Sequence, residues 1–155
     1  MLKICLFAFV VLIGSVKLDS IPFMDCGSGD NLLDVDIIGC SRLPCPVKMG
    51  GEHSIKISLI SKMPSKHLNQ NVELIVRAIH TRIQVTPDDP CHEINCPVSL
   101  NRNASLNAIM HIPKTGLVPL DAILVWKIHN DAGDQVVCME TEVTIEKSKM
   151  EYELD

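Results

Sequence analysis

Aromatic side chains are scarce in this sequence, at 3% of 155 residues. An excess of positive charge is also missing, because 14 Lys and Arg stand against 19 Asp and Glu. This balance argues against nucleic-acid binding, which requires a basic face to displace counterions. Runs of like charge and low-complexity tracts are absent, and 46% of the residues are hydrophobic, which argues against disorder. The length fits one domain with a substantial core.

Motifs of catalytic and cofactor sites are missing as well. The sequence contains no G-x-S-x-G, H-E-x-x-H, P-loop or G-x-G-x-x-G pattern, and its six histidines are scattered singly. Asp88 and Asp89 lie between two prolines, which is typical of a solvated turn and not of a catalytic pair of acids. We therefore predict that the chain is not an enzyme and holds neither a cofactor nor a metal.

The one long apolar run lies at the N-terminus. Lys3 precedes an apolar stretch from Ile4 to Ile13, and Gly14 and Ser15 follow it. This layout predicts a signal peptide at residues 1–18, with cleavage between 15 and 20, because a membrane anchor, the alternative, needs a longer run. The rest of the chain is then secreted to the extracellular space or delivered to a lysosomal or endosomal lumen. Secretion also predicts N-glycosylation of Asn103 in the sequon Asn-Ala-Ser.

Cysteine is abundant, with seven residues, of which Cys5 belongs to the predicted signal peptide. Six cysteines in an oxidising compartment indicate three disulfides, although counting alone leaves their pairing open. A zinc site is the alternative, because His92 follows a cysteine, but the full zinc-finger spacing is absent. The spacing favours two short loops and one link between the ends of the domain: Cys40 with Cys45, Cys91 with Cys96, and Cys26 with Cys138.

Between the cysteines, apolar and polar residues alternate with a period of two. Such alternation predicts β-strands with one buried and one solvated face, and no segment shows a helical apolar stripe. The residues Asn-Asp-Ala-Gly-Asp at 130–134 are typical of a hairpin loop. We predict an all-β, immunoglobulin-like antiparallel β-sandwich of two sheets and about seven strands. The alternating runs lie at 32–38, 55–60, 72–78, 104–112, 120–128 and 137–146.

The inner faces of these strands consist of Val, Ile, Leu, Ala and Met with few rings. Such a layer can pack tightly, or it can leave a dry hydrophobic cavity that a lipid fills. Composition alone favours the tight core, because protein interiors are generally close-packed.

Several short motifs follow one another along the chain in a distinctive order. They are Asp25-Cys26-Gly27-Ser28, the Cys40 and Cys45 pair, Ile94-Asn95-Cys96-Pro97 after Cys91, Leu124-Val125-Trp126-Lys127-Ile128, and Cys138 with Glu140. This order resembles the ML lipid-recognition family, and within it the chain is most similar to the soluble Niemann–Pick type C sterol carriers and more distantly to the group-two dust-mite allergens. The resemblance covers residues 19–155, and it implies disulfides 26–138, 40–45 and 91–96 and a hydrophobic tunnel between the sheets.

The tunnel mouth is where the chain departs from the sterol carriers, which have aromatic residues there. The corresponding stretches at 81–85 and 112–118 contain none, and this difference concerns sterol specificity and not lipid binding. Strand alternation predicts the side chains that contact the lipid. These are Ile83, Ile112, Leu117 and Val118 near the mouth, and Val35, Ile37, Ile57, Leu74, Val76, Leu124, Trp126, Met139 and Val143 on the walls.

We therefore expect a monomeric, non-catalytic carrier of sterol, fatty acid or another lipid. A membrane lipid-transfer protein or a receptor would be its protein partner. Two competing hypotheses are a secreted recognition protein for microbial lipid and a chemosensory carrier of small hydrophobic signals.

Overall fold

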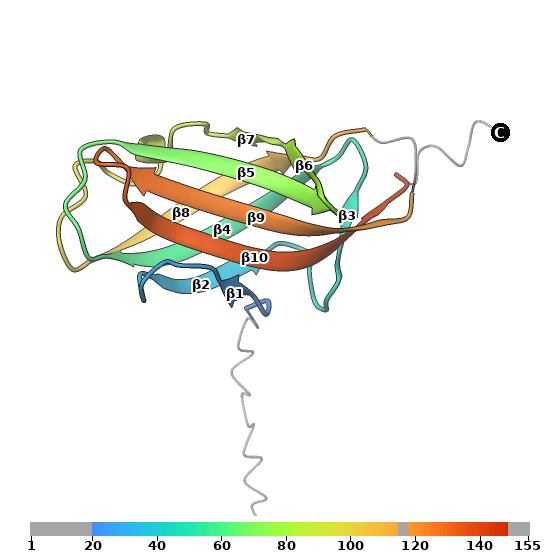
Figure 1. Ribbon diagram of the computed structural model, residues 1–155, viewed down its shortest axis with the longest axis horizontal. Helices are drawn as coiled ribbons and strands as arrows, with labels where there is room; N and C mark the ends of the chain where they lie inside the picture. The colour runs from blue at the N-terminus through green and yellow to red at the C-terminus, as the bar shows by residue number, and fades with distance from the viewer. Residues whose placement is uncertain (1–19, 115–117, 149–155) are drawn as a thin grey trace, which may run out of the picture.

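Two β-sheets packed face to face make up the structure, a computed structural model that describes residues 20–114 and 118–148 (Figure 1). The six-stranded sheet has the order β1-β10-β9-β5-β6, with β3 also paired to β10, and the four-stranded sheet has the order β2-β4-β8-β7. The predicted signal peptide at 1–18 lies outside the described residues. The strands are β1 (Met24–Asp25), β2 (Leu32–Ile37), β3 (Cys45–Lys48), β4 (Glu52–Ser61), β5 (Leu68–Val76), β6 (Ile79–Arg82), β7 (Gln84–Thr86), β8 (Arg102–His111), β9 (Leu120–Asn130) and β10 (Gln135–Glu146).

The long hairpin of β9 and β10 is the centre of the six-stranded sheet. On both strands apolar side chains alternate toward the four-stranded sheet, and Met139 pairs directly with Trp126. The turn between the strands is held by Asn130, whose Oδ1 accepts hydrogen bonds from the backbone N–H of Ala132 and Asp134. Gly133 supplies the positive φ of 86° that this turn requires. The predicted sandwich and this hairpin are confirmed.

Four short strands, β1, β3, β6 and β7, are additions to the predicted set. One of them, β3, runs parallel to β10, so the six-stranded sheet is not purely antiparallel. The predicted run at 72–78 also ends early, because Arg77 adopts a positive φ of 57° and the chain turns there. Ala78 is consequently exposed and does not continue the inward face.

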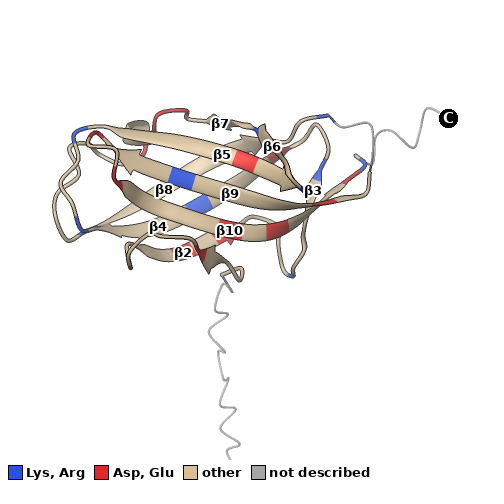
Figure 2. Cartoon of the chain, in the orientation of Figure 1, with Lys and Arg blue, Asp and Glu red and all other residues tan. Residues whose placement is uncertain are grey.

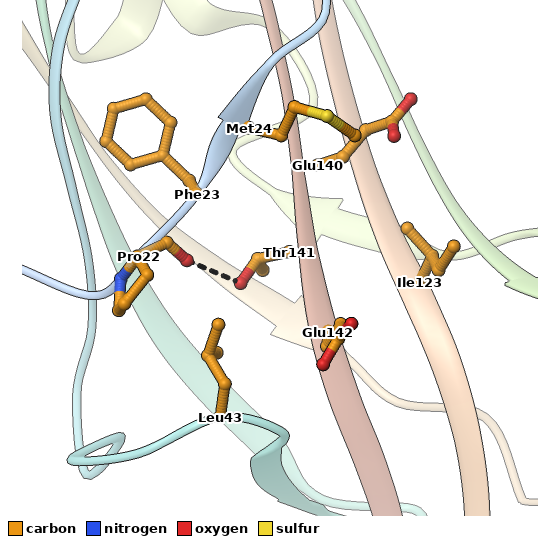
Figure 3. Close-up of a pocket in the computed structure, with 8 residues that line it drawn as sticks. All are labelled: Pro22, Phe23, Met24, Leu43, Ile123, Glu140, Thr141 and Glu142. Carbon is orange, nitrogen blue, oxygen red and sulfur yellow. Dashed lines mark hydrogen bonds between the residues drawn. The ribbon is translucent and has the colours of Figure 1, made fainter.

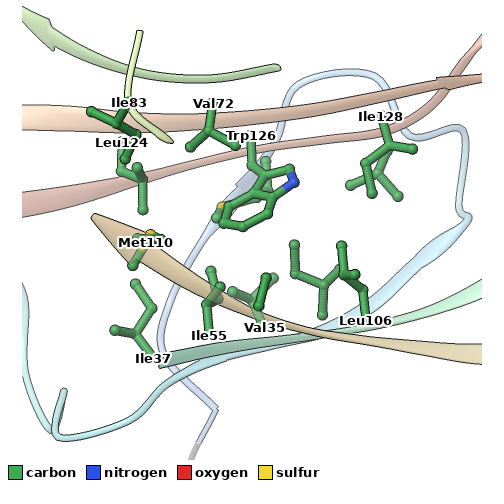
Figure 4. Packing of buried hydrophobic residues seen from close by; sticks show 14 of the residues in the cluster. Val35, Ile37, Ile55, Val72, Ile83, Leu106, Met110, Leu124, Trp126 and Ile128 are labelled. Carbon is green, nitrogen blue, oxygen red and sulfur yellow. The ribbon is translucent and has the colours of Figure 1, made fainter. Parts of the chain in front are cut away.

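The core is the apolar layer between the two sheets. Figure 4 shows side chains of β5 and β9 meeting those of β2, β4 and β8, with the indole of Trp126 between them. This layer excludes solvent almost completely. Its largest side chains with less than 2% exposure include Trp126, Ile37, Ile55, Ile57, Leu59, Leu106, Met110, Leu124, Ile128 and Met139.

One edge of the sandwich is where the chain passes from one sheet to the other. β6 ends at Arg82 and β7 begins at Gln84, so Ile83 is the single residue between the two layers. Ile83 is 5% exposed, and its backbone N–H donates to the carbonyl of Val72 at 2.9 Å. The described residues contain one helical turn, η1 (Pro90–His92), and no helix in them is long and apolar enough to cross a membrane.

Candidate functional site

The side chains predicted to contact lipid come together in the interior. Val35, Ile37, Ile57, Leu74, Leu124, Trp126, Met139 and Val143 are each at most 2% exposed and belong to one cluster, together with Ile83 and Ile112 near one edge. Val76 and Val118 are half-buried and pack against this cluster, and Leu117 lies outside the described residues. The structure thus collects these positions in one layer, while their contact with lipid stays a prediction.

A pocket with walls from both sheets opens at the edge where β6 leads into β7. Its volume is about 480 Å³. Val72, Ile83 and Val85 supply apolar surface, and two of them are part of the buried core. Arg82, Gln84, Thr86, Asp88 and His111 add polar side chains, so the opening combines apolar and polar walls. We call this pocket the edge opening.

At the edge opening, polar side chains connect β7 with β8, two strands of the four-stranded sheet. Thr86 on β7 contacts His111 on β8, with 2.9 Å between the threonine Oγ1 and the imidazole Nε2. The other ring nitrogen of His111 lies 3.4 Å from a carboxylate oxygen of Glu52 on β4. The sequence showed this histidine alone, because its partners are contributed by other strands.

Gln70 is a polar residue of the edge opening that the sequence did not single out. It lies on the buried face of β5, at the alternate position between Leu68 and Val72, and is 8% exposed. Its Nε2 donates to the carbonyls of Pro87 and Asp88 at 2.6 and 3.0 Å and so fixes the loop after β7. Counting back by two from Val72 would have placed this side chain on the inner face.

A second pocket, of about 360 Å³, lies beside β10 where the segment 22–24 runs along the strand (Figure 3). The Thr141 hydroxyl donates to the carbonyl of Pro22 at 3.1 Å and attaches this segment to β10. All the strand residues in its lining belong to the six-stranded sheet, so it does not join the two layers. The lining residues are Pro22, Phe23, Met24, Leu43, Ile123, Glu140, Thr141 and Glu142.

The motif Asp25-Cys26-Gly27-Ser28 attaches the start of the domain to β10 of the six-stranded sheet. Desolvation raises the pKa of Asp25, but its Oδ1 accepts hydrogen bonds from the backbone N–H of Ser28 and Gly27, and these hold the pKa below its ordinary value. Gly27 has a φ of 130°, a backbone conformation that residues with a side chain rarely adopt. The Ser28 hydroxyl forms hydrogen bonds with the backbone of Cys138. The motif therefore has a structural role in this protein.

The six cysteines that the structure describes form three disulfides, in the pairs that the spacing favoured. They link Cys26 with Cys138, Cys40 with Cys45, and Cys91 with Cys96.

Another charged contact lies on the outer face, where β5 pairs with β6. Glu73 accepts hydrogen bonds from His80 at 3.0 Å and from the Asn71 amide at 2.6 Å, and these contacts lower its pKa despite a smaller opposing effect of desolvation. Figure 2 shows Lys and Arg interspersed with Asp and Glu along the strands that face the viewer. Asn103 is exposed on β8, and its glycosylation stays a prediction.

The family model of the ML domain matches residues 20–145 of the chain. The chain belongs to the ML domain family. Among its relatives, the NPC intracellular cholesterol transporter 2 of Sus scrofa is 26% identical over 143 residues, which cover 90% of this chain and 95% of that protein.

Two solved structures agree with this ML domain in fold. A Niemann-Pick type C2 protein from Japanese carpenter ant superposes with a TM-score of 0.69 at 15% identity, covering 81% of this chain and 100% of that one. Chicken MD-1, solved in complex with lipid IVa, gives a TM-score of 0.55 at 14% identity, covering 79% of this chain and 87% of that one. The porcine relative is named a cholesterol transporter and chicken MD-1 holds a lipid, which agrees with the non-enzymatic, lipid-binding character predicted for this chain.

Proposed function

We propose that this ML domain is a secreted or lumenal carrier that takes up a sterol or fatty acid between its two sheets, through the edge opening. The observation that carries the proposal is the edge opening itself, because its walls come from both sheets and reach the buried Val72 and Ile83. An apolar ligand that inserts there loses its water-exposed surface, which is the main source of affinity for such ligands.

The size of the expected affinity follows from the ligand. At about 0.3 kcal/mol per heavy atom, a sterol-sized ligand of about 28 heavy atoms gains roughly 8 kcal/mol. This free energy corresponds to micromolar dissociation constants, which allow a carrier to release its cargo. The proposed carrier acts as a monomer and passes its ligand to a membrane lipid-transfer protein or receptor.

The inner layer is the proposed binding volume. Because core side chains fill it, the sheets must part for a ligand to insert, and the predicted wall residues would then contact the lipid. The side chains that pack between the two sheets in this cluster are apolar. Moving the sheets apart therefore exposes apolar surface, which the bound ligand covers again.

A bulky side chain at the edge opening tests the proposal. Val85 on β7 is half-buried and lines the opening, so Val85→Phe should obstruct it with little cost in stability. We expect at least about a tenfold loss of affinity, or about 1.4 kcal/mol, for a fluorescent sterol or fatty acid in the lipid-free protein. Ile79→Phe is the matched control, because Ile79 lies on the neighbouring edge strand β6, is 68% exposed and is not part of the opening.

Thermal unfolding of both variants, measured in parallel, separates obstruction from misfolding. Unchanged binding by a folded Val85→Phe variant would contradict access through this edge. Native mass spectrometry of the secreted protein would identify the bound lipid, and microbial glycolipid in place of sterol or fatty acid would support the recognition hypothesis instead.

A further inference from the structure

Four buried side-chain polar atoms have no hydrogen-bond partner among the described residues; besides Asn31 Oδ1 and Ser105 Oγ, two of them belong to neighbouring strands of the six-stranded sheet and face the inner layer. These two atoms are Oε1 of Gln70 and Nε1 of Trp126. Gln70 is 8% exposed and Trp126 is 0% exposed. Buried polar groups in native proteins are nearly always hydrogen-bonded, and a buried indole N–H usually finds an acceptor. An unpaired acceptor and an unpaired donor in the same layer therefore point to a ligand.

The orientation of the Gln70 amide is fixed by its own contacts. Its nitrogen lies within hydrogen-bond distance of the carbonyl oxygens of Pro87 and Asp88, and a carbonyl oxygen can only accept. The amide nitrogen is thus committed to the loop after β7. The oxygen remains as an acceptor for a group that the protein does not supply.

Gln70 and Trp126 are diagonal neighbours on the inner face of the six-stranded sheet. Gln70 on β5 pairs with Ile128 on β9, and Val72 pairs with Trp126, so the two residues are offset by one diagonal step on adjacent strands. Long side chains at such positions are within reach of each other. Figure 4 shows the indole nitrogen on the side of the ring that faces Ile128, the strand partner of Gln70.

The chemical complement of a donor beside an acceptor is a group that both accepts and donates. We propose that Gln70 and Trp126 bind the free hydroxyl of an otherwise apolar lipid, which accepts from the indole N–H and donates to the amide oxygen. This inference rests on the proposed function and adds to it the ligand class, a sterol or long-chain alcohol with a free hydroxyl. A methyl ether accepts from Trp126 but leaves Gln70 unpaired, because it has no hydrogen to donate.

The sequence provides a specific probe, because Trp126 is its only tryptophan. The indole N–H resonance in an NMR spectrum therefore reports on this site alone. A hydroxyl that accepts a hydrogen bond from Nε1 should move this resonance downfield, whereas a lipid that only fills apolar space should not.

The experiment compares alcohols with their methyl ethers in the lipid-free full-length secreted protein. Cholesterol and its 3-methyl ether form one pair, and hexadecanol and methyl hexadecyl ether form the other. We expect the protein to bind at least one alcohol roughly three- to tenfold more tightly than its ether, with a downfield shift of the indole N–H. Gln70→Met should abolish the preference, and Asn69→Ala, an exposed position beside it, should retain it.

The variants also separate hydrogen bonding from the bulk of the added methyl group. A steric penalty on the ether would persist in Gln70→Met, and that result would overturn the inference. Equal binding of alcohol and ether by the wild-type protein would overturn it too, even if Gln70→Met does not fold. If the wild-type protein binds none of the four probes, the proposed function itself fails. A preference confined to one pair supports the inference and identifies the ligand as sterol or as linear alcohol.

Discussion

Ser28 shows how one side chain can replace part of a β-strand. β1 consists of two residues, so it is too short to satisfy the backbone of β10 beyond Cys138. The Ser28 hydroxyl takes over this role, because it accepts from the N–H of Cys138 at 2.8 Å and donates to the carbonyl of the same residue at 3.1 Å. Ser28 is 1% exposed, so water cannot substitute for it.

Replacing Ser28 by alanine should destabilise the fold. The N–H of Cys138 would be left buried without an acceptor, which costs about 1–3 kcal/mol. Urea unfolding monitored by circular dichroism measures this loss. Ser58→Ala on the outer side of β4 is the control and should change the free energy of unfolding by no more than about 0.5 kcal/mol. Equal effects of the two substitutions would show that Ser28 does not support β10.

For single residues, the sequence predicted which cysteines pair but not which hydrogen bonds the polar side chains form. Spacing favoured the cysteine pairs, because a five-residue separation can close a local loop, and the family resemblance implied the same three pairs. The contacts of Ser28 and Gln70 depend on Cys138 and on the loop after β7, which are brought near them only by folding. Periodicity reports which face a residue occupies, and it contains no information on which hydrogen-bond partners that face meets.

The turn between β3 and β4 is an element with a built-in response to pH. The Nε2 of His53 accepts a hydrogen bond from the backbone N–H of Lys48 at 2.8 Å, which requires an unprotonated nitrogen. Desolvation by burial, with a further contribution from the Lys48 charge, lowers the pKa of His53 below its ordinary 6.5. The unfolded chain therefore binds the proton more readily than the folded protein does.

Acidification should consequently lower the free energy of unfolding, because His53 takes up a proton more readily in the unfolded chain. Its contribution to stability is complete above the ordinary pKa of 6.5 and is lost as the pH falls from there toward the folded pKa. Urea midpoints at about pH 7 and pH 5 measure the effect. His53→Gln keeps an acceptor but cannot titrate, so it should lose less stability over this interval. A wild-type protein and variant with the same pH dependence would contradict this role.

The sequence predicted a strand best where the strand is long and its apolar and polar residues alternate regularly. β9 and β10 pair without interruption over nine positions, from Val137 with Ile128 to Ile145 with Leu120, and their hairpin carries the expected Asn and Gly. β6 and β7 form an exposed, short edge in which the chain changes sheets, so no period of two can develop. β3 contains Pro46 and pairs in parallel with a strand nearly a hundred residues away, which local pattern cannot indicate.

For the whole molecule, the link between Cys26 and Cys138 is the main covalent constraint. These residues are 112 positions apart, whereas each of the other two disulfides spans five. On the chain-entropy model, removing a cross-link over about 100 residues costs about 4.7 kcal/mol and one over five residues costs about 2 kcal/mol.

The double substitution of Cys26 and Cys138 by alanine should therefore reduce the free energy of unfolding more than the same change at Cys91 and Cys96. Differential scanning calorimetry of the two variants provides the comparison. The reverse order, or equal losses, would mean that strain or residual structure in the unfolded chain outweighs loop entropy.

The position of the long-range disulfide also separates resistance to unfolding from the ability of the layers to move apart. Cys138 lies on β10, and Cys26 directly follows β1 of the same sheet and donates its backbone N–H to the carbonyl of Cys138, so the cross-link does not connect the two sheets. The sheets are joined by chain connections such as Ile83 and by apolar contacts, which have no preferred direction and can re-form around a guest molecule. The protein can thus resist global unfolding while its two sheets remain able to move apart.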